Sequence, residues 1–125
     1  TNDTRESPAI SVVKELLDNG ANIIIHDPKV TGSQISKLFD EKKIGQKNTN
    51  VEGKWQYTND LNLLFKDADA IIILTEWADY LNIDWKIMSK LMRKPSWVFD
   101  TRGIVEQDKI NGLEINFWRV GKGFI

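Results

Sequence analysis

Apolar residues recur along this chain in two patterns that alternate with each other. Some stretches carry them three or four residues apart, as on one face of a helix, and others are short continuous runs rich in β-branched residues. Helical spacing predicts helices at 7–18, 31–43, 61–69, 84–92 and, briefly, within 104–111. Continuous apolar runs predict strands at 23–25, 70–74 and 97–99, with a short edge strand within 55–60 and a last strand at 115–121.

Strands that alternate with helices are typical of βαβ units with right-handed crossovers. Continuous apolar runs further indicate strands that are buried on both faces, as in a parallel sheet. The predicted fold class is therefore α/β, a doubly wound and mostly parallel Rossmann-like sheet with 23–25, 70–74 and 97–99 at its centre. The pattern starts at a helix that Ser7 can cap, so we expect the first strand of this fold to be missing from the chain.

The helix that follows residue 83 carries the most explicit signals. Asp84 is expected to cap its N-terminus, and the inward face is expected to hold Trp85, Met88, Leu91 and Met92. By contrast, residues 44–54 show no periodicity and are predicted to form a loop.

Composition narrows the class of protein. The chain has 125 residues of even composition, which favours one domain, and a net charge of -1, which gives no reason to expect nucleic acid as a partner. It contains neither a signal peptide nor an apolar run near the roughly 20 residues of a membrane span, so a cytoplasmic location is expected. With no cysteine, the chain offers no disulfide framework, zinc ribbon or thiol nucleophile.

Ligands of open α/β sheets bind beyond the carboxyl ends of the strands, and charged residues follow three of the predicted strands. Asp27 stands where a dinucleotide fold keeps its ribose-binding acid, but the glycine-rich turn of that fold is missing, so an Asp-Pro turn is favoured. Thr75 and Glu76 either face a ligand or bind loop backbone and hold Trp77 against the sheet. His26, the single histidine, is expected to be packed rather than catalytic.

Arg102 is the strongest candidate for a binding residue. Its guanidinium can fork onto a phosphate or a base carbonyl, and Gly103 beside it permits a ligand to approach closely. A salt bridge to Asp100 is an equally weighted alternative. Arg5 lies one turn ahead of a helix N-terminus, a position that favours anions, although it could instead pair with a neighbouring acid.

Four motifs, "TNDTRESPAI", "IHDPKV", "ADAIIILTEW" and "KPSWVFDTRGI", follow one another in the order and spacing of the nucleotide-sugar 6-dehydrogenases. The chain resembles the C-terminal, UDP-binding domain of that family over most of its length, and most closely the members that act on UDP-glucose. The resemblance implies oxidation of UDP-glucose to UDP-glucuronate, with two NAD per turnover and a thiohemiacetal on a cysteine. It also implies that residues 1–125 are one domain of a larger homo-oligomer, inactive alone, whose cysteine and main NAD site lie outside this chain.

Carried over residue by residue, the resemblance implies that Arg102 of "FDTRG" binds the UDP part of the substrate and that Arg5 of "TRESP" reaches the NAD. The family often has Gly-Arg or Ser-Arg after the aspartate, where this chain has Thr101-Arg102. Neither arginine is a nucleophile or a base, so the expected role of the domain is to position the sugar for chemistry supplied elsewhere.

Two other interpretations stay open. GDP-mannose dehydrogenases and UDP-N-acetylhexosamine dehydrogenases share similar segments, so the nucleotide sugar could differ. A non-catalytic α/β module that binds a nucleotide or a partner protein would also lack a cysteine and a catalytic base.

Overall fold

A computed structural model describes residues 8–40 and 53–125 of the chain, which comprises two compact units, Thr1–Asp60 and Leu61–Ile125. The described strands form two hydrogen-bonded sheets, one in each unit, and every strand pairing but one is parallel. The chain is thus an α/β protein of the Rossmann-like class with mostly parallel strands, as predicted. The three strands expected at the centre of one sheet are divided between the two sheets, with 23–25 in the first sheet and the other two in the second. That the chain lacks the first strand of the fold stays a prediction.

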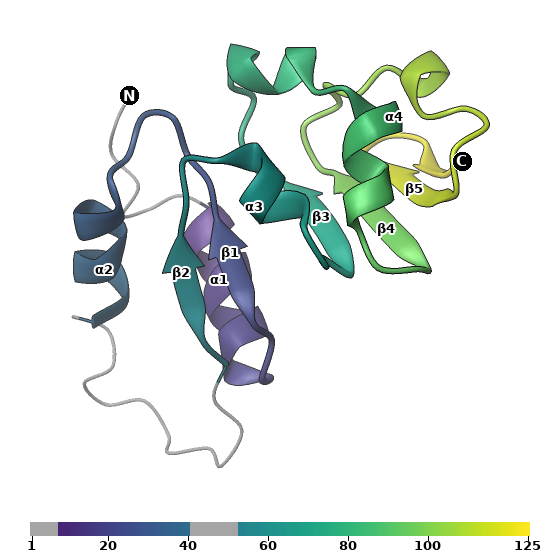
Figure 1. Ribbon diagram of the computed structural model, residues 1–125. Coiled ribbons are helices and arrows are strands. Elements are labelled where there is room, and N and C mark those ends of the chain that lie inside the picture. Colours follow the sequence, from purple (N-terminus) through teal and green to yellow (C-terminus); the bar gives the residue numbers. More distant parts are fainter. Residues whose placement is uncertain (1–7, 41–52) are drawn as a thin grey trace. The chain divides into compact units, whose positions relative to one another are not determined.

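The first unit contains four described elements, α1 (Pro8–Asp18), β1 (Ile23–Ile25), α2 (Gly32–Asp40) and β2 (Trp55–Tyr57), each within a predicted segment (Figure 1). β1 and β2 are parallel, with Ile24 opposite Gln56. The helices and strands of this unit share one apolar cluster, whose buried members are Val30, Ile35 and Phe39. The three isoleucines of β1 are half-buried rather than buried as predicted, because the hydrogen-bonded sheet of this unit has only two described strands.

Helix α1 ends at Asp18 and is capped by a glycine two residues later. Gly20 adopts a φ of 89°, its N–H donates to the Leu17 carbonyl, and the next N–H, of Ala21, reaches back to Leu16. This pair of bonds is a Schellman motif, which satisfies carbonyls that the end of a helix leaves unpaired. Gly53 then passes so close that a Cβ on it would lie 1.9 Å from the Ala21 carbonyl oxygen.

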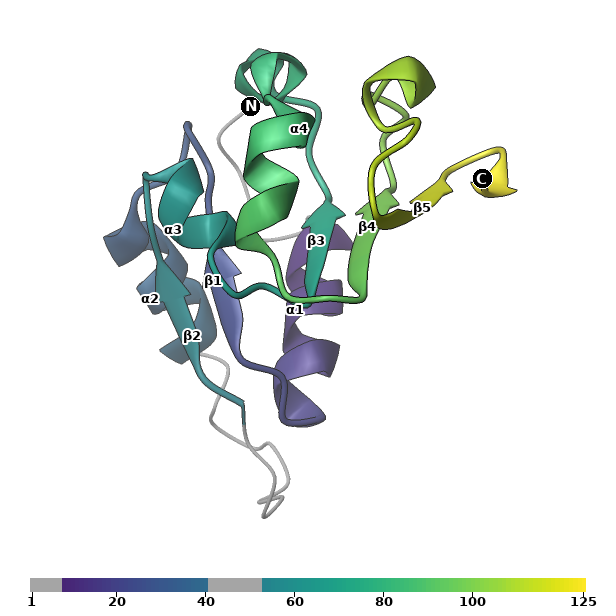
Figure 2. The ribbon, with the colours of Figure 1, turned by 45° about the vertical axis from the view of Figure 1, so that its right-hand side comes forward.

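The second unit is built on a four-stranded sheet in the order β3-β4-β5-β6 (Figure 2). Its strands are β3 (Ala70–Ile73), β4 (Ser96–Asp100), β5 (Ile115–Arg119) and β6 (Gly123–Phe124). Its helices are α3 (Leu61–Phe65), α4 (Trp85–Met88) and the 3-10 turns η2 (Ala78–Asn82), η3 (Ser89–Leu91) and η4 (Gln107–Lys109). β3, β4 and β5 are parallel, and β6 folds back antiparallel to β5.

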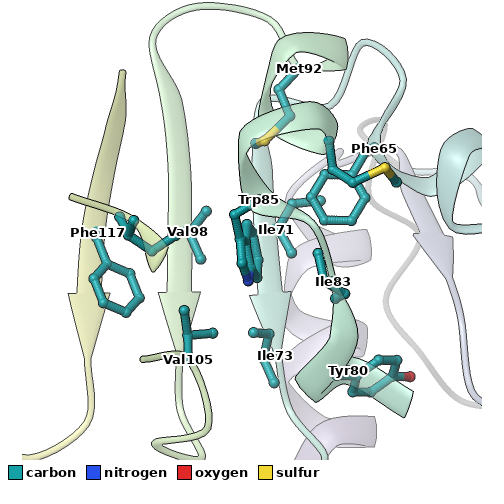
Figure 3. Packing of buried hydrophobic residues seen from close by; sticks show 12 residues of the cluster. Phe65, Ile71, Ile73, Tyr80, Ile83, Trp85, Met92, Val98, Val105 and Phe117 are labelled. Carbon is teal, nitrogen blue, oxygen red and sulfur yellow. The ribbon is translucent and has the colours of Figure 1, made fainter. Parts of the chain in front are cut away.

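One face of this sheet carries the core of the second unit (Figure 3). Ile71, Val98 and Phe117, one from each parallel strand, are buried there in one cluster that also contains Trp85 of α4. The Trp85 ring meets the Phe65 ring edge-on, with 5.5 Å between centroids. Successive side chains of a strand point to opposite faces, so Asp100, two residues after Val98, is directed to the same buried side.

Two details of this unit differ from the sequence-based expectation of continuous burial and a long helix. Ile72 is 37% exposed, because the core lies on only one face of β3 and its side chain points to the other. Leu91, predicted to face inward, is also 37% exposed. The α-helix ends at Met88 and continues as a 3-10 turn, whose tighter winding moves Leu91 off the inward stripe.

Candidate functional site

Arg102 lies on a turn directly after β4, at the carboxyl end of the parallel strands. The turn is built around the buried Asp100 side chain, which is 0% exposed. Its Oδ1 accepts the backbone N–H groups of Arg102 at 3.0 Å and Gly103 at 2.8 Å, and its Oδ2 accepts that of Val105 at 2.7 Å. Three backbone donors are thereby fixed by one carboxylate, which is how the sequence "FDTRG" holds its arginine at the sheet edge.

The same turn is tied to the neighbouring strand. The Thr101 hydroxyl donates to the Ile73 carbonyl at 2.6 Å, and the Thr101 N–H reaches the same oxygen at 3.2 Å. Gly103 has a φ of 71°, in the left-handed region that favours glycine. The glycine is therefore needed for the turn itself. The position of a Cβ on it would lie 3.7 Å from Arg119 Nη2 and from a Val120 methyl group, so the room for a ligand expected beside Gly103 stays a prediction.

The guanidinium of Arg102 pairs with Glu76, which follows β3. Nε and Nη2 of Arg102 donate to Glu76 Oε2 at 3.1 Å and 2.7 Å. The side chains are 41% and 63% exposed, and an exposed ion pair of this kind contributes at most about 1 kcal/mol. The alternative salt bridge to Asp100 is therefore wrong, because the Asp100 carboxylate binds backbone N–H groups and its own ion pair is with Arg119.

Glu76 thus contacts the Arg102 side chain rather than the loop backbone that one interpretation expected. That Glu76 faces a ligand stays a prediction. Trp77 does pack against the core cluster, as one interpretation expected. Its indole Nε1 is buried and has no hydrogen-bond partner within residues 8–40 and 53–125.

Sequence reasoning missed Arg119, at the end of β5. Its Nη2 donates to the Gly103 carbonyl at 2.7 Å, and its Nε lies 3.9 Å from Asp100 Oδ2. The two strands place Arg119 directly opposite Asp100 in the sheet register. Only this register brings the two residues together, and a sequence without known strand pairing carries no signal for it.

The other candidates lie in the first unit. The Asp27 carboxylate accepts the Lys29 N–H at 2.8 Å, which confirms the Asp-Pro turn. His26 is half-buried. Arg5, the predicted NAD contact, lies outside the described residues.

The candidate site among the described residues is the strand-end turn that carries Arg102. No cluster of His, Cys, Asp and Glu within 8–40 and 53–125 could hold a metal ion. The same ranges contain no glycine-rich turn between a strand and a helix that would cradle the phosphates of a dinucleotide, so they do not fit a main NAD site. A helix able to cross a membrane is likewise missing from these two ranges. What they do offer is a guanidinium on a rigid strand-end turn, a group suited to an anionic ligand.

Comparison with known proteins assigns the chain to a family. The sequence model described as "UDP-glucose/GDP-mannose dehydrogenase family, UDP binding domain" matches residues 1–107. Among curated relatives, UDP-glucose 6-dehydrogenase 1 of Glycine max is 36% identical over 98% of this chain and 27% of its own length. The UDP-glucose 6-dehydrogenase of Drosophila melanogaster is 31% identical over 99% of this chain and 26% of its own length. UDP-glucose 6-dehydrogenase 4 of Arabidopsis thaliana is 35% identical over 98% of this chain and 27% of its own length. The chain spans about a quarter of the length of these relatives, in the part that matches the UDP binding domain; it belongs to the UDP-glucose/GDP-mannose dehydrogenase family.

Proposed function

We propose that this chain is the C-terminal UDP-binding domain of an NAD-dependent UDP-glucose 6-dehydrogenase, and that Arg102 binds the UDP part of the substrate. The observation that carries the proposal is the turn after β4, on which Asp100 fixes the backbone and leaves the Arg102 guanidinium exposed at the carboxyl end of the sheet. Ligands of open α/β sheets bind at this edge. Membership of the family and the names of the relatives support UDP-glucose as the substrate.

Arg102 suits a diphosphate for electrostatic reasons. Its guanidinium keeps its charge at any physiological pH and presents parallel N–H donors that match two phosphate oxygens. In this structure those donors face a carboxylate oxygen of Glu76, which occupies the place that we assign to an anionic oxygen of the ligand. A charge-assisted contact of this kind contributes about 1.5–3 kcal/mol to binding.

The chemistry of the reaction would come from other parts of the enzyme. Oxidation of the sugar alcohol to a carboxylate transfers two hydrides to two NAD molecules and takes its second oxygen from water. This chain has no cysteine to hold the intermediate. Its part is to hold UDP so that the sugar carbon meets the nicotinamide and the thiol, which is catalysis by positioning. The 125-residue chain mixed with UDP-glucose and NAD should accordingly produce no NADH.

Calorimetric titration of the full-length protein with UDP, UDP-glucose, a UDP-N-acetylhexosamine and GDP tests the proposal. UDP and UDP-glucose should bind with similar affinity, and GDP should bind more weakly. Tighter binding of GDP would favour GDP-mannose as the substrate, and a preference for UDP-N-acetylhexosamines over UDP-glucose would favour that branch of the family. If none of these nucleotides binds, a module for a partner protein becomes the better explanation. We further propose that the full-length enzyme is a cytoplasmic homo-oligomer, which its mass in solution and its cell fraction would test.

A further inference from the structure

Arg119, beside Asp100 in the sheet, contacts the turn that carries Arg102. Its Nη2 donates to the Gly103 carbonyl at 2.7 Å, and its Nε lies 3.9 Å from Asp100 Oδ2. The side chain is 26% exposed, and its Nε is buried with no hydrogen-bond partner among the described residues. Arg119 therefore contacts both the backbone of the turn and the carboxylate that organises it.

Asp100 and Arg119 hold the turn through different kinds of backbone group. Asp100 takes the N–H groups of residues 102 and 103, whereas Arg119 takes the carbonyl group of Gly103. The strand register sets Arg119 opposite Asp100, and the next N–H, of Val120, donates to the Asp100 carbonyl at 2.9 Å. The end of β5 thus binds the carbonyl groups of Asp100 and Gly103, which lie on either side of Arg102.

The charge of Arg119 matters as well as its hydrogen bond. Asp100 is 0% exposed, and a buried carboxylate needs donors and an opposite charge to offset its lost hydration. The Arg119 guanidinium supplies that charge within 4 Å. Without it, Asp100 would keep its three backbone donors but lose its ion pair, and the Gly103 carbonyl would lose the donor that holds its side of the turn.

We propose that Arg119 is a positioning residue for nucleotide binding, which fixes the strand-end turn so that the Arg102 guanidinium meets the diphosphate of the ligand. The proposal rests on the proposed function of Arg102. Arg119 acts through Arg102 rather than on the ligand, because its Nη2 is engaged by the Gly103 carbonyl and its Nε is buried against Asp100. The proposed site therefore uses two arginines: Arg102 on the turn meets the ligand, and Arg119 at the end of β5 fixes the turn.

A double-mutant cycle on UDP affinity, measured by calorimetry on the full-length protein, tests this inference. We expect Arg119→Ala to weaken UDP binding by roughly 3- to 10-fold in the presence of Arg102, in line with the coupling of residues that share one network. In the Arg102→Ala background the same change should have no further effect, since the group that it positions is gone. Arg119→Gln keeps an N–H donor for the Gly103 carbonyl without the charge, and it should fall between Ala and the native residue.

Arg93→Ala is the matched control. Arg93 is an exposed arginine of the same unit, paired with Asp69 across 3.4 Å, and its loss should leave UDP affinity unchanged. If Arg119→Ala does not fold, Arg119→Lys serves in the same cycle, since it keeps the charge but loses the planar fork.

Three outcomes would overturn the inference, and they differ in what they say of Arg102. Losses that add in the double variant would mean that Arg119 contacts the ligand itself. Unchanged affinity in the Arg119 variants, with a loss in Arg102→Ala, would leave the proposed function intact and remove only the role of Arg119. Unchanged affinity in Arg102→Ala would overturn the proposed function and this inference together.

Discussion

The carboxylate of Glu76 and the guanidinium of Arg102 meet at 2.7 Å across the ends of β3 and β4. A ligand phosphate that binds Arg102 through the same N–H groups must displace this carboxylate. Glu76→Gln removes the competing charge and should tighten UDP binding by about 2- to 5-fold, the range set by an exposed ion pair. Titration calorimetry would measure this change in UDP affinity. Glu106→Gln is the control, since Glu106 is an exposed glutamate of the same unit. Weaker binding in Glu76→Gln would show instead that Glu76 orients Arg102 for the ligand.

Arg102→Ala should weaken UDP and UDP-glucose alike by roughly 10- to 100-fold, since a charge-assisted contact to the part that they share is lost. Arg102→Lys should recover only part of that affinity, because an ammonium lacks the planar fork. The comparison needs titrations of both ligands on folded variants. A loss for UDP-glucose with none for UDP would place Arg102 at the sugar instead of the nucleotide.

Asp100→Asn should destabilise the protein by an amount on the order of 3 kcal/mol, because an amide group would turn N–H donors toward backbone N–H groups and would leave Arg119 without its counter-charge. Chemical unfolding of the 125-residue chain would report the change. Asp108→Asn is the control, since Asp108 is exposed on the turn η4 and its replacement should cost less than about 0.5 kcal/mol. Equal stability of the two variants would contradict the role given to the buried carboxylate.

Gly53→Ala should destabilise the first unit by about 1–3 kcal/mol or more, as overpacking does elsewhere. The added Cβ would lie 1.9 Å from the Ala21 carbonyl oxygen, so the backbone must shift. Chemical unfolding of the same chain is again suitable. Gly112→Asn offers a comparison, because Gly112 has no atoms within 4 Å of its Cβ position and asparagine tolerates its left-handed φ of 81°. Similar losses in the free energy of unfolding in both variants would argue against the close approach of Gly53 to Ala21.

Arg5→Ala, in the full-length enzyme, should raise the KM for NAD much more than the KM for UDP-glucose. The reason is the proposed reach of Arg5 toward the cofactor, together with its place ahead of a helix N-terminus, where anions are favoured. Steady-state kinetics with each substrate varied in turn would measure both constants. Equal effects on the two KM values, or a loss of thermal stability without any change in kinetics, would favour the alternative that Arg5 pairs with a neighbouring acid.

The sequence was sufficient for most of the described helices and strands and for the place of Arg102 in the sheet. Runs such as "AIIIL" and "SWVF" have few alternatives to buried strands, and the Asp84 cap is confirmed by its 3.2 Å bond to the Ile87 N–H. Because charged residues follow these runs, Arg102 could be placed at the carboxyl edge from its position alone.

What could not be predicted depends on pairing in space. Arg119 contacts Asp100 only because β4 and β5 align in one register, and Glu76 meets Arg102 only because β3 and β4 are neighbours. The strand β6 consists of Gly123 and Phe124 alone, which is too short for any hydrophobic period to appear. Leu91 was misplaced because apolar spacing alone does not distinguish an α-helix from a 3-10 turn.

The bonds from Asp100 to the N–H groups of residues 102, 103 and 105 also bear on the thermodynamics of recognition. A loop that becomes ordered only on binding loses conformational entropy at that step, and its affinity falls accordingly. Here the backbone beneath Arg102 is preorganised by a residue that the nucleotide does not need to touch. Most of the ordering that remains for the ligand is then the rotation of one arginine side chain, so affinity at this site should be set by charge and geometry more than by induced fit.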